Sequence, residues 1–462
     1  MNKTGVNEKS LSLEECLSYA DETKCLLIKK EADKDIPNLL EEYFKSGVVC
    51  LVADENTFTA AGKKLKSFLE ESGIKISGSY IFPGEPRLHA DYSYVSLLKE
   101  WLNSLPAFPR ITPVSIGSGT INDLVKRTSS ELNLPYLSFP TAASVDGYTP
   151  NGAALLVSGF KQTLACPAPL VIAADTDVLA GAPAYLNSSG FGDLAGKIIA
   201  GTDWIIAEKA GSFGAGGAPP IDPIAWSMVY NSLLPALKKS VKAAKGDTDA
   251  LKALFESLAV TGFAMQYMKS SRPVSGSEHL LSHVWEMEGL SKNGIPVTHG
   301  FKVTIGTLAA TAFTEIFFSD PKGPPPVPKT HRFPGFEERK AEIMESFASS
   351  RALEMILETA MGKMPDENTA KKTSEGFRDC WKETRDIVLE KLVPYGELKK
   401  ILKEAGCPIK PEEIGLNRTD AIKSIQKAQM IRDRYGIFDL AWGMGNMQKA
   451  AETLEKSWRY LR

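Results

Sequence analysis

The strongest constraint on the fold is the alternation of short apolar, β-branched runs with helical patterns in the first third of the chain. Buried strands are predicted at residues 48–53, 79–82, 111–116 and 136–139. Helical periodicity is found between them, at residues 58–72, 92–105 and 121–132. Strands separated by helices of this length pair in parallel through right-handed crossovers. The pattern therefore predicts an α/β domain with a parallel sheet, a layout typical of nucleotide-binding domains.

The strand signal ends near residue 175. Just before it, residues 155–157 and 162–164 predict a small hairpin, and residues 170–174 predict one more buried strand. A chain of 462 residues exceeds the size at which one hydrophobic core keeps growing, so two domains are expected. We place the boundary near residues 177–183. The expected division is an α/β domain over residues 1–180 and an all-α domain over residues 181–462.

The second part of the chain carries helical patterns and two irregular stretches. Amphipathic helices are predicted at residues 336–361, 375–391 and 418–435. Glycine and proline predict a loop over residues 211–224, and the proline-rich run 321–329 predicts an extended connection. Residues 301–318 form the most apolar long run, but Lys302, Glu315 and four threonines favour a buried helix over a membrane span.

Composition excludes several classes of partner. The net charge of −2 provides neither a basic stripe for nucleic acid nor a polybasic membrane anchor, so a small-molecule ligand is expected. Six cysteines without CxxC spacing argue against a disulfide framework and against a cysteine zinc cluster. The N-terminal segment lacks the apolar core of a signal peptide. We therefore expect a cytoplasmic protein without membrane insertion, and the oligomeric state, a homo-oligomer included, stays open.

Three of the five histidines lie within residues 275–300. His279 and His283 are four residues apart, which stacks both imidazoles on one face of a helix, and His299 opens a second helical run after a short loop. Histidines on facing helices can hold a metal, because neutral imidazole is a common metal ligand. Hydrogen-bonded core histidines would give the same pattern, and the residues alone do not separate the two interpretations.

A glycine turn follows the strand predicted at residues 111–116 and reads GSGTINDL. A strand, a tight turn and a helix N-terminus together present backbone N–H groups to a phosphate. The spacing is not GxGxxG, because Asn122 stands at the third glycine position, so an ordinary strand-to-helix turn is an alternative. Asp54 follows the strand at residues 48–53, where it could bind ribose hydroxyls or cap a helix.

The motifs in this order resemble the sn-glycerol-1-phosphate dehydrogenase family, within the wider group of glycerol dehydrogenases, iron-containing alcohol dehydrogenases and dehydroquinate synthases. The matching stretches are GSGTINDLVK (117–126), FPTAASVDGY (139–148), SSGFGDLAGK (188–197), GSEHLLSHVWEM (276–287) and HGFKVTIGTL (299–308). The resemblance runs from about residue 45 to about residue 445. It implies a dehydroquinate synthase-like fold, with a dinucleotide-binding α/β domain and a helical domain that binds metal and substrate. It also implies interconversion of dihydroxyacetone phosphate and sn-glycerol 1-phosphate with NAD(P)H.

The resemblance assigns a divalent metal to Asp193, His279 and His299, which would be the catalytic group. It assigns substrate contacts to Asp146 and His283, although Asp146 before a glycine is also an ordinary turn residue. One carboxylate and two imidazoles leave open positions, as in a catalytic rather than a structural site. Zinc is the first choice, and nickel and ferrous iron also suit these ligands.

The resemblance places the cofactor along three segments. The implied residues are Asp54 at the adenosine end, Gly117, Ser118, Gly119, Thr120, Ile121 and Asp123 around the pyrophosphate, and Thr141, Ala142, Ala143 and Ser144 beside the nicotinamide. Asp54 favours NADH over NADPH, because it would repel a 2′-phosphate. Two positions depart from the family pattern. Pro150 replaces a serine that often bonds the cofactor, and Phe301 replaces a glutamate, which removes an acceptor for the metal ligands.

A phosphorylated substrate requires a cationic contact that a free polyol does not need. Lys197 lies four residues after Asp193, on the same helix face, and His283 could add a second contact. Pairing of Lys197 with a carboxylate, or exposure to solvent, is the alternative. The remaining alternatives for function are a glycerol or other polyol dehydrogenase of the same group, or an inactive scaffold that keeps the fold as a binding module.

Overall fold

The computed structural model describes residues 9–157, 160–325 and 332–460. The chain forms two compact units. The first, here called the sheet unit, comprises Ser10–Leu194 and Leu234–Ser270, and the second, the helical unit, contains Ala195–Leu233 and Ser271–Arg462. Helix α8 (Ala184–Ser212) belongs to both units, because it continues across residue 194. The division at residue 180 expected from the sequence stays a prediction.

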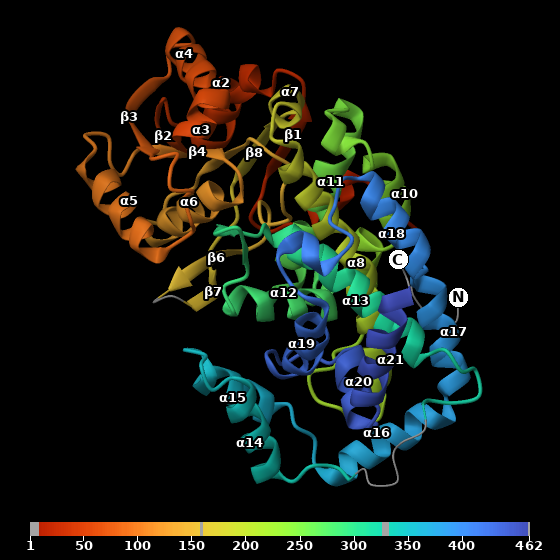
Figure 1. The fold of residues 1–462 in the computed structure, drawn as a ribbon. Coiled ribbons are helices and arrows are strands. Elements are labelled where there is room, and N and C mark those ends of the chain that lie inside the picture. Colours follow the sequence, from red (N-terminus) through yellow and green to blue (C-terminus); the bar gives the residue numbers. More distant parts are fainter. Residues whose placement is uncertain (1–8, 158–159, 326–331, 461–462) are drawn as a thin grey trace. The chain divides into compact units, whose positions relative to one another are not determined.

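The sheet unit contains a six-stranded sheet in which every neighbouring pair is parallel (Figure 1). Its strands are β1 (Cys25–Lys29), β2 (Val48–Asp54), β3 (Lys75–Phe82), β4 (Thr112–Gly117), β5 (Leu137–Pro140) and β8 (Val171–Asp175). Their order across the sheet is β1-β8-β5-β4-β2-β3. The parallel α/β sheet expected from the sequence is therefore confirmed. The edge strand β1 was not predicted, because its partner β8 is more than 140 residues away along the chain.

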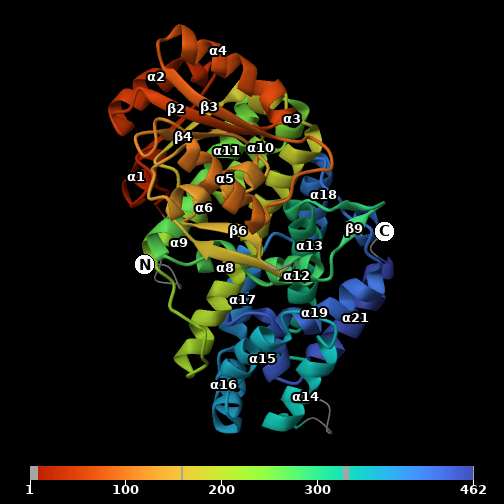
Figure 2. The ribbon, with the colours of Figure 1, turned by 90° about the vertical axis from the view of Figure 1, so that its left-hand side faces the viewer.

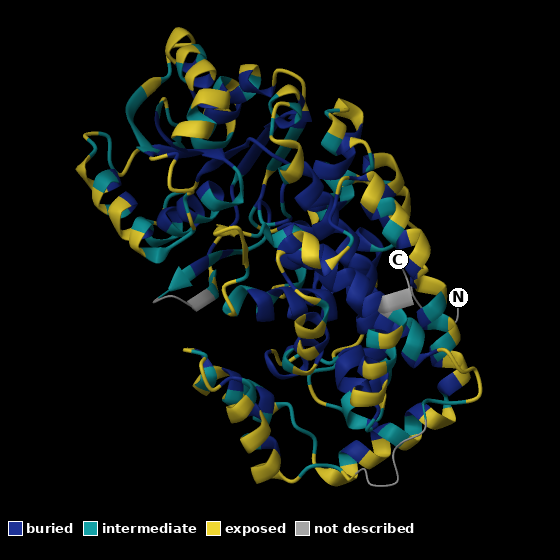
Figure 3. Ribbon diagram, viewed as in Figure 1, coloured by how far each residue is buried: buried dark blue, intermediate teal, exposed yellow. Residues whose placement is uncertain are grey.

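Both faces of the sheet are covered, and the strands are largely buried (Figure 3). Successive side chains of a strand point to opposite faces. Leu51 accordingly packs with Leu65 of one helical layer, whereas Val52 packs with Leu98 and Leu124 of the other. The two layers are formed by α2 (Ile36–Leu39) and α4 (Lys63–Glu71) on one face, and by α5 (Tyr92–Ser104) and α6 (Gly119–Glu131) on the other. This double cover explains why the strands read as continuous apolar runs.

The other elements of the sheet unit surround this core. The predicted hairpin is present as the antiparallel pair β6 (Gly152–Val157) and β7 (Phe160–Ala165), and its turn, residues 158–159, lies outside the described residues. The remaining helices are α1 (Leu13–Ser18), α3 (Glu55–Thr57), α7 (Thr176–Ala180), α10 (Leu233–Ser240) and α11 (Thr248–Met268). The predicted helix over residues 58–72 begins with a π-helical turn, Phe58–Gly62, before α4.

The helical unit is built around α12 (Ser277–Met287) and α13 (His299–Phe317), which pack against each other (Figure 2). Gly306 permits this approach, because a Cβ there would lie 2.4 Å from the carbonyl oxygen of Glu278. The short strands β9 (Ser291–Lys292) and β10 (Ile295–Pro296) connect the two helices. The further helices are α9 (Pro223–Val229), α14 (Phe336–Ser346), α15 (Leu353–Gly362), α16 (Glu367–Asp379), α17 (Trp381–Lys391), α18 (Tyr395–Glu404), α19 (Arg418–Met430), α20 (Ile437–Gly443) and α21 (Met447–Tyr460).

Two of the predicted C-terminal helices are each divided in the structure. The helix expected over residues 336–361 is α14 and α15, separated by a turn in which the Ser350 hydroxyl accepts from the Ala352 N–H at 3.2 Å. Such local bonds compete with helix continuation, and periodicity does not report them. The helix expected over residues 375–391 is likewise divided at Cys380.

The remaining expectations for this unit concern its termini and connections. Helix α19 ends at Met430, five residues before the predicted end. The extended connection predicted for residues 321–329 is described as far as residue 325, and this part contains neither helix nor strand. Helix α13 is largely buried, as predicted, and no described helix combines the length and apolar composition needed to cross a membrane.

A buried lysine provides a test of the packing in the sheet unit. Lys126 of α6 is fully buried, and its ammonium group donates to the carbonyls of Gly147, Pro150 and Gly152 at 2.9–3.0 Å. Lys126→Met removes all three donors while keeping the apolar volume. We expect the free energy of unfolding in urea to fall by about 2 to 4 kcal/mol. Lys66→Met, which replaces a solvent-exposed side chain of α4, is the control and should change the free energy of unfolding by about 0.5 kcal/mol or less.

Candidate functional site

The strand order brings two predicted cofactor segments to the same edge of the sheet. β2 pairs with both β3 and β4, so the chain leaves β2 in one direction and returns on its other side. Ligands of open α/β sheets bind at the carboxyl ends of strands at such a switch point. Asp54 ends β2 and Gly117 ends the neighbouring β4. The two residues therefore lie at the position in the sheet unit where a dinucleotide is expected.

The glycine turn leads directly into the N-terminus of α6. A Cβ at Gly117 would lie 2.6 Å from the Cβ of Ile121, so glycine is required for the strand to approach the helix this closely. Ser118 is the N-cap residue and makes no side-chain bond to the first turn. The N–H groups of the first turn thus lack a side-chain cap, which suits a phosphate acceptor.

Asn122, which replaces the third glycine of the usual fingerprint, is buried and fully engaged. Its side-chain oxygen accepts from the hydroxyls of Tyr136 and Ser138 at 3.2 and 3.0 Å, and its amide donates to the carbonyl of Gly147 at 3.3 Å. The residue thus links α6 to β5 and to the loop that follows residue 146. The departure from GxGxxG is explained by this structural role.

Asp54 and Asp123 both bond to nearby backbone. Asp54 caps α3, because its Oδ1 accepts from the Thr57 N–H at 2.8 Å, so the capping interpretation is confirmed. Asp123 Oδ2 accepts from the Ala154 N–H of β6 at 3.3 Å. The cap uses one oxygen of Asp54 and leaves the ribose assignment untested. The cofactor roles of both residues stay predictions.

The segment expected beside the nicotinamide, residues 141–144, is buried and held through its backbone. The Thr141 N–H donates to the carbonyl of Gly117 at 3.1 Å, which joins this segment to the glycine turn. The Ala143 N–H donates to Asn187 Oδ1 of α8 at 3.0 Å. Gly190 of α8 also lies against this segment, because a Cβ at this position would be 1.8 Å from the Ala143 carbonyl oxygen. The start of α8 therefore fixes this segment.

The same helix carries Asp193 and Lys197, both fully buried and one turn apart. The Asp146 N–H donates to Asp193 Oδ2 at 2.9 Å, which ties the predicted substrate aspartate to the predicted metal ligand. The alternative in which Lys197 reaches solvent is wrong, because none of its side chain is exposed. Its assignment to a substrate phosphate stays a prediction.

Helix α8 also lies closely against α12 and α13. A Cβ at Gly196 would lie 2.8 Å from Val303 Cγ1 and 3.6 Å from the Cε1 carbon of the His279 ring. Asp193 is one turn before Gly196 on this continuous helix. One ligand atom each from Asp193, His279 and His299 lies within 4.8 Å of the other two. The three residues form a candidate metal group.

Each histidine of this group has a carboxylate at its Nδ1 nitrogen. His279 Nδ1 lies 2.6 Å from Glu278 Oε1, and His299 Nδ1 lies 3.0 Å from Glu286 Oε1. A neutral imidazole that donates from Nδ1 has its lone pair on Nε2. The two carboxylates therefore set the tautomer in which Nε2 can bind a metal, and such partners also fix the ring orientation.

Glu286 is the residue that sequence reasoning missed. The Phe301 departure indicated that the metal ligands lack an acceptor, but the structure supplies Glu286 from α12. Its Oε1 contacts His299 and also Lys302 Nζ, at 2.9 Å, and its Oε2 lies 3.3 Å from His283 Nδ1. Nearly all of the Glu286 side chain is buried. The signal in the sequence is its position, seven residues after His279 and therefore on the same helix face.

His283 lies beside the metal group, as its spacing predicts, with its ring 6.2 Å from those of His279 and His299. The pKa of His283 is lowered to about 3, chiefly by burial, while the hydrogen bond and charge of Glu286 raise it and the charges of Arg432 and His299 lower it. The imidazole is therefore neutral near pH 7. Any contact that it makes with a substrate uses the neutral tautomer rather than a positive charge.

A second buried carboxylate supports the segment before His279. Asp203 of α8 accepts from the N–H groups of Ser277 and Ile437 at 2.6 and 2.8 Å. The pKa of Asp203 is raised to about 6, chiefly by burial, while its hydrogen bonds with Ser277 and Ile437 lower it and the charge of Glu278 raises it. Glu278 Oε1 also accepts from the Gly276 N–H at 2.9 Å. The start of α12 is thereby fixed in position.

Comparison with known proteins gives two kinds of match. A family model described as iron-containing alcohol dehydrogenase matches residues 27–183. The chain is 33% identical over 312 residues to glycerol-1-phosphate dehydrogenase [NAD(P)+] of Geobacillus thermodenitrificans, covering 66% of this chain and 74% of that protein. It is 30% identical over 385 residues to the Bacillus velezensis protein of the same name, and the match covers 83% of this chain and 82% of that protein.

Solved structures match over nearly the whole chain. Glycerol dehydrogenase from Schizosaccharomyces pombe superposes with a TM-score of 0.57 at 16% identity, covering 95% of this chain and 91% of that chain. A crystal structure of 1,3-propanediol oxidoreductase gives a TM-score of 0.58 at 15% identity, covering 95% and 99%. At these identities the likeness shows the fold, which agrees with the dehydroquinate synthase-like fold expected from the sequence.

Glu286→Gln tests the role of the missed carboxylate. The amide keeps the shape but cannot accept from His299 and Lys302 with a charged oxygen, so we expect affinity for Zn²⁺ to fall about 10- to 100-fold. Zn²⁺ competition against a chromophoric chelator measures this directly, without reference to turnover. Glu288→Gln is the matched control, because Glu288 is more exposed and pairs with Lys427 instead. Equal Zn²⁺ affinity of the Glu286→Gln and Glu288→Gln proteins would contradict the assignment.

Proposed function

The chain belongs to the glycerol-1-phosphate dehydrogenase family and is therefore an oxidoreductase, and we propose that it interconverts dihydroxyacetone phosphate and sn-glycerol 1-phosphate with NAD(H) or NADP(H). The observation that carries the proposal is the group of Asp193, His279 and His299, whose ligand atoms converge within 4.8 Å. Relatives that carry this activity in their names support the choice of substrate.

The residues present fit a divalent metal. One carboxylate and two imidazoles, each with a carboxylate at its Nδ1 nitrogen, match the ligand set of a catalytic site, and such a set leaves positions for substrate. These ligands suit zinc, nickel and ferrous iron, of which zinc is our first choice. A divalent ion bound there would lower the pKa of the substrate hydroxyl and polarise the carbonyl of the ketone.

The protein's own contribution is orientation and exclusion of water. Glu278 and Glu286 hold the two imidazoles, and the Asp146 N–H holds one oxygen of Asp193. Asp193 and Glu278 are fully buried, so charges at this position interact in a medium of low dielectric constant. Such fixed groups need no reorganisation during the reaction.

The cofactor is proposed to bind at the carboxyl edge of β2 and β4. The uncapped N-terminus of α6, with Gly117, Ser118, Gly119, Thr120 and Ile121, is suited to the pyrophosphate. Asp54 lies at the neighbouring strand end, where its negative charge would disfavour the 2′-phosphate of NADPH. We therefore propose that NADH is preferred. A reducing compartment such as the cytoplasm is proposed as well, in keeping with six cysteines that are free thiols.

Activity measurements on two substrates test the function. We expect the Zn²⁺-loaded protein to oxidise NADH with dihydroxyacetone phosphate far more efficiently than with dihydroxyacetone, as judged by kcat/KM. His299→Ala should lose bound metal and nearly all turnover but retain NADH binding, because the proposed cofactor residues belong to the sheet unit. Higher efficiency with dihydroxyacetone would indicate a polyol dehydrogenase. Absence of both stoichiometric metal and saturable NADH binding would indicate a scaffold.

Lys197→Met tests how the phosphate is distinguished from a free polyol. Methionine keeps most of the buried volume but removes the charge. Loss of one charge-assisted hydrogen bond should lower kcat/KM for dihydroxyacetone phosphate by about 10- to 150-fold. The value for dihydroxyacetone should stay nearly unchanged. Lys209→Met is the control on the same helix, because Lys209 is partly exposed and pairs with Glu383. Equal losses for both substrates, with metal content intact, would show that the phosphate is bound elsewhere.

A further inference from the structure

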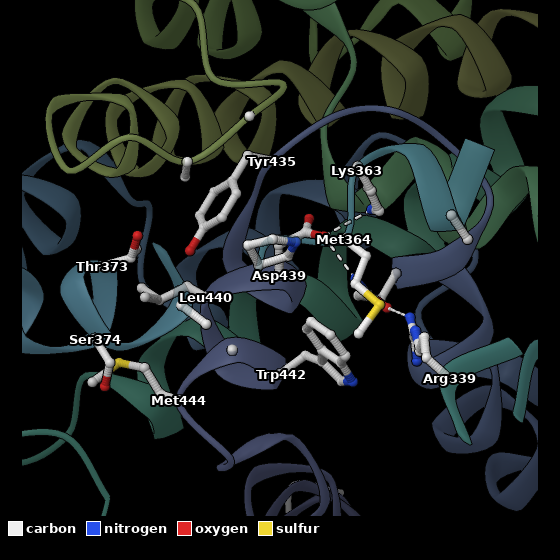
Figure 4. A pocket seen from close by; sticks show the side chains of 17 residues that line it. Arg339, Lys363, Met364, Thr373, Ser374, Tyr435, Asp439, Leu440, Trp442 and Met444 are labelled. Carbon is white, nitrogen blue, oxygen red and sulfur yellow. Dashed lines mark hydrogen bonds and ion pairs between the residues drawn. The ribbon is translucent and has the colours of Figure 1, made fainter. Parts of the chain in front are cut away.

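The helical unit contains a pocket that the proposed reaction does not use (Figure 4). Its wall is formed by residues in or next to α14, α15, α16, α19 and α20, together with Ala215 and Gly216. About 590 Å³ of space lies between and in front of these side chains, and this figure includes the open mouth of the pocket. None of the predicted metal, substrate or cofactor residues lines it.

A buried ion pair forms one polar part of the pocket. Lys363 Nζ lies 2.7 Å from Asp439 Oδ1, and the two side chains are 6% and 7% exposed. Asp439 is further bonded, because Oδ1 accepts from Gln429 Nε2 at 2.9 Å and Oδ2 accepts from the Gly436 N–H at 3.1 Å. The ammonium carries three hydrogens, and within the described residues its bond is to Asp439. Lys363 therefore retains donor capacity toward a ligand.

A hydroxyl forms another polar part. Thr373 is 7% exposed, and its Oγ1 is buried without a hydrogen-bond partner among the described residues. A buried hydroxyl that makes no hydrogen bond costs free energy, so such atoms require an explanation. Figure 4 shows Thr373 and the Tyr435 hydroxyl on one side of the pocket, and Lys363 and Arg339 on the other. A ligand that reaches both sides would satisfy the Thr373 hydroxyl.

Much of the remaining lining is apolar, and two cationic side chains border it. Met364, Leu440 and Met444 contribute apolar side chains, and the guanidinium of Arg339 lies 4.4 Å from the centre of the Trp442 ring. Two of the charged lining residues, Arg339 and Lys363, are basic and one, Asp439, is acidic, which gives a net charge of +1 (2 − 1). Glu342, which lies outside the lining, pairs with Arg339 at 2.6 Å and offsets its charge.

We propose that this pocket binds a small monocarboxylate with an apolar body. The carboxylate accepts from Lys363, whose ammonium retains donor capacity beside Asp439. The apolar body lies along Met364, Leu440 and the Trp442 ring, and a hydrogen-bonding group at its far end pairs with Thr373. The donors of the lining select a carboxylate over a cation, because an ammonium ligand would face Lys363 and Arg339.

Calorimetric titration of the metal-loaded full chain with 8-hydroxyoctanoate tests the proposal. This probe has a carboxylate, an apolar body and a terminal hydroxyl. We expect saturable binding with a stoichiometry of one per chain, and binding of 1-octanol at least tenfold weaker. Absence of saturable binding, or equal affinity for 1-octanol, would overturn the proposal.

Thr373→Val identifies the site. Valine has nearly the shape of threonine, and removal of an unpartnered hydroxyl should leave folding intact. We expect affinity for 8-hydroxyoctanoate to fall about five- to tenfold. The control Lys371→Met replaces an exposed side chain of the same helix, α16, and this variant should bind as the unmodified chain does. Unchanged affinity in Thr373→Val would overturn the assignment.

A titration of His299→Ala separates this pocket from the proposed active site. The affinity of this variant for 8-hydroxyoctanoate should equal that of the unmodified chain, because His299 does not line the pocket. Loss of binding in His299→Ala would show that the probe binds at the metal group, and would overturn the proposal without affecting the proposed dehydrogenase function.

Discussion

The candidate site depends on hydrogen bonds between buried carboxylates and imidazoles. Glu278 and Glu286 belong to α12, but Glu286 orients a histidine of α13, so the bond from Glu286 to His299 joins the two helices. A carboxylate withdrawn from water is costly unless its oxygens are bonded, and Glu286 meets this requirement through His299, His283 and Lys302. The bond to His299 lies at its Nδ1 nitrogen and therefore favours the tautomer whose lone pair is on Nε2.

Close backbone approach makes these bonds reachable. Gly306 allows α13 to lie against the carbonyl of Glu278, and Gly196 allows α8 to lie against both helices. Helix α8 continues without interruption through both units, and its two parts perform different tasks. Asn187 and Gly190 hold the backbone of residues 141–144 in the sheet unit, whereas the later residues pack in the helical unit. Asp193 lies near the junction of these two parts.

Buried polar side chains in the sheet unit serve a related purpose. Asn122 and Lys126 lie one turn apart on α6, and both donate to the carbonyl of Gly147. They fix the loop that contains Asp146, whose N–H bonds Asp193. A glycine at residue 122 could not make these bonds. Departure from a familiar fingerprint is here accompanied by a specific set of hydrogen bonds, because the loop requires donors more than the helix requires a small residue.

The sequence alone determined the parallel α/β sheet, because strand and helix periodicities are local, and it indicated Asp193, His279 and His299 through the family motifs. Tertiary structure decided the rest. The edge strand β1 depends on a partner far along the chain. The divided helices are an exception, because they depend on local bonds such as that of Ser350, which periodicity does not report. In the sequence, Glu286 does not differ from many other acidic residues. Its role depends on the packing of α13, which places His299 beside it. The pocket likewise requires Lys363, Thr373 and Asp439, from three helical regions, to meet. Contacts between distant segments leave no periodic signal in the sequence, so they can be seen only in the three-dimensional structure.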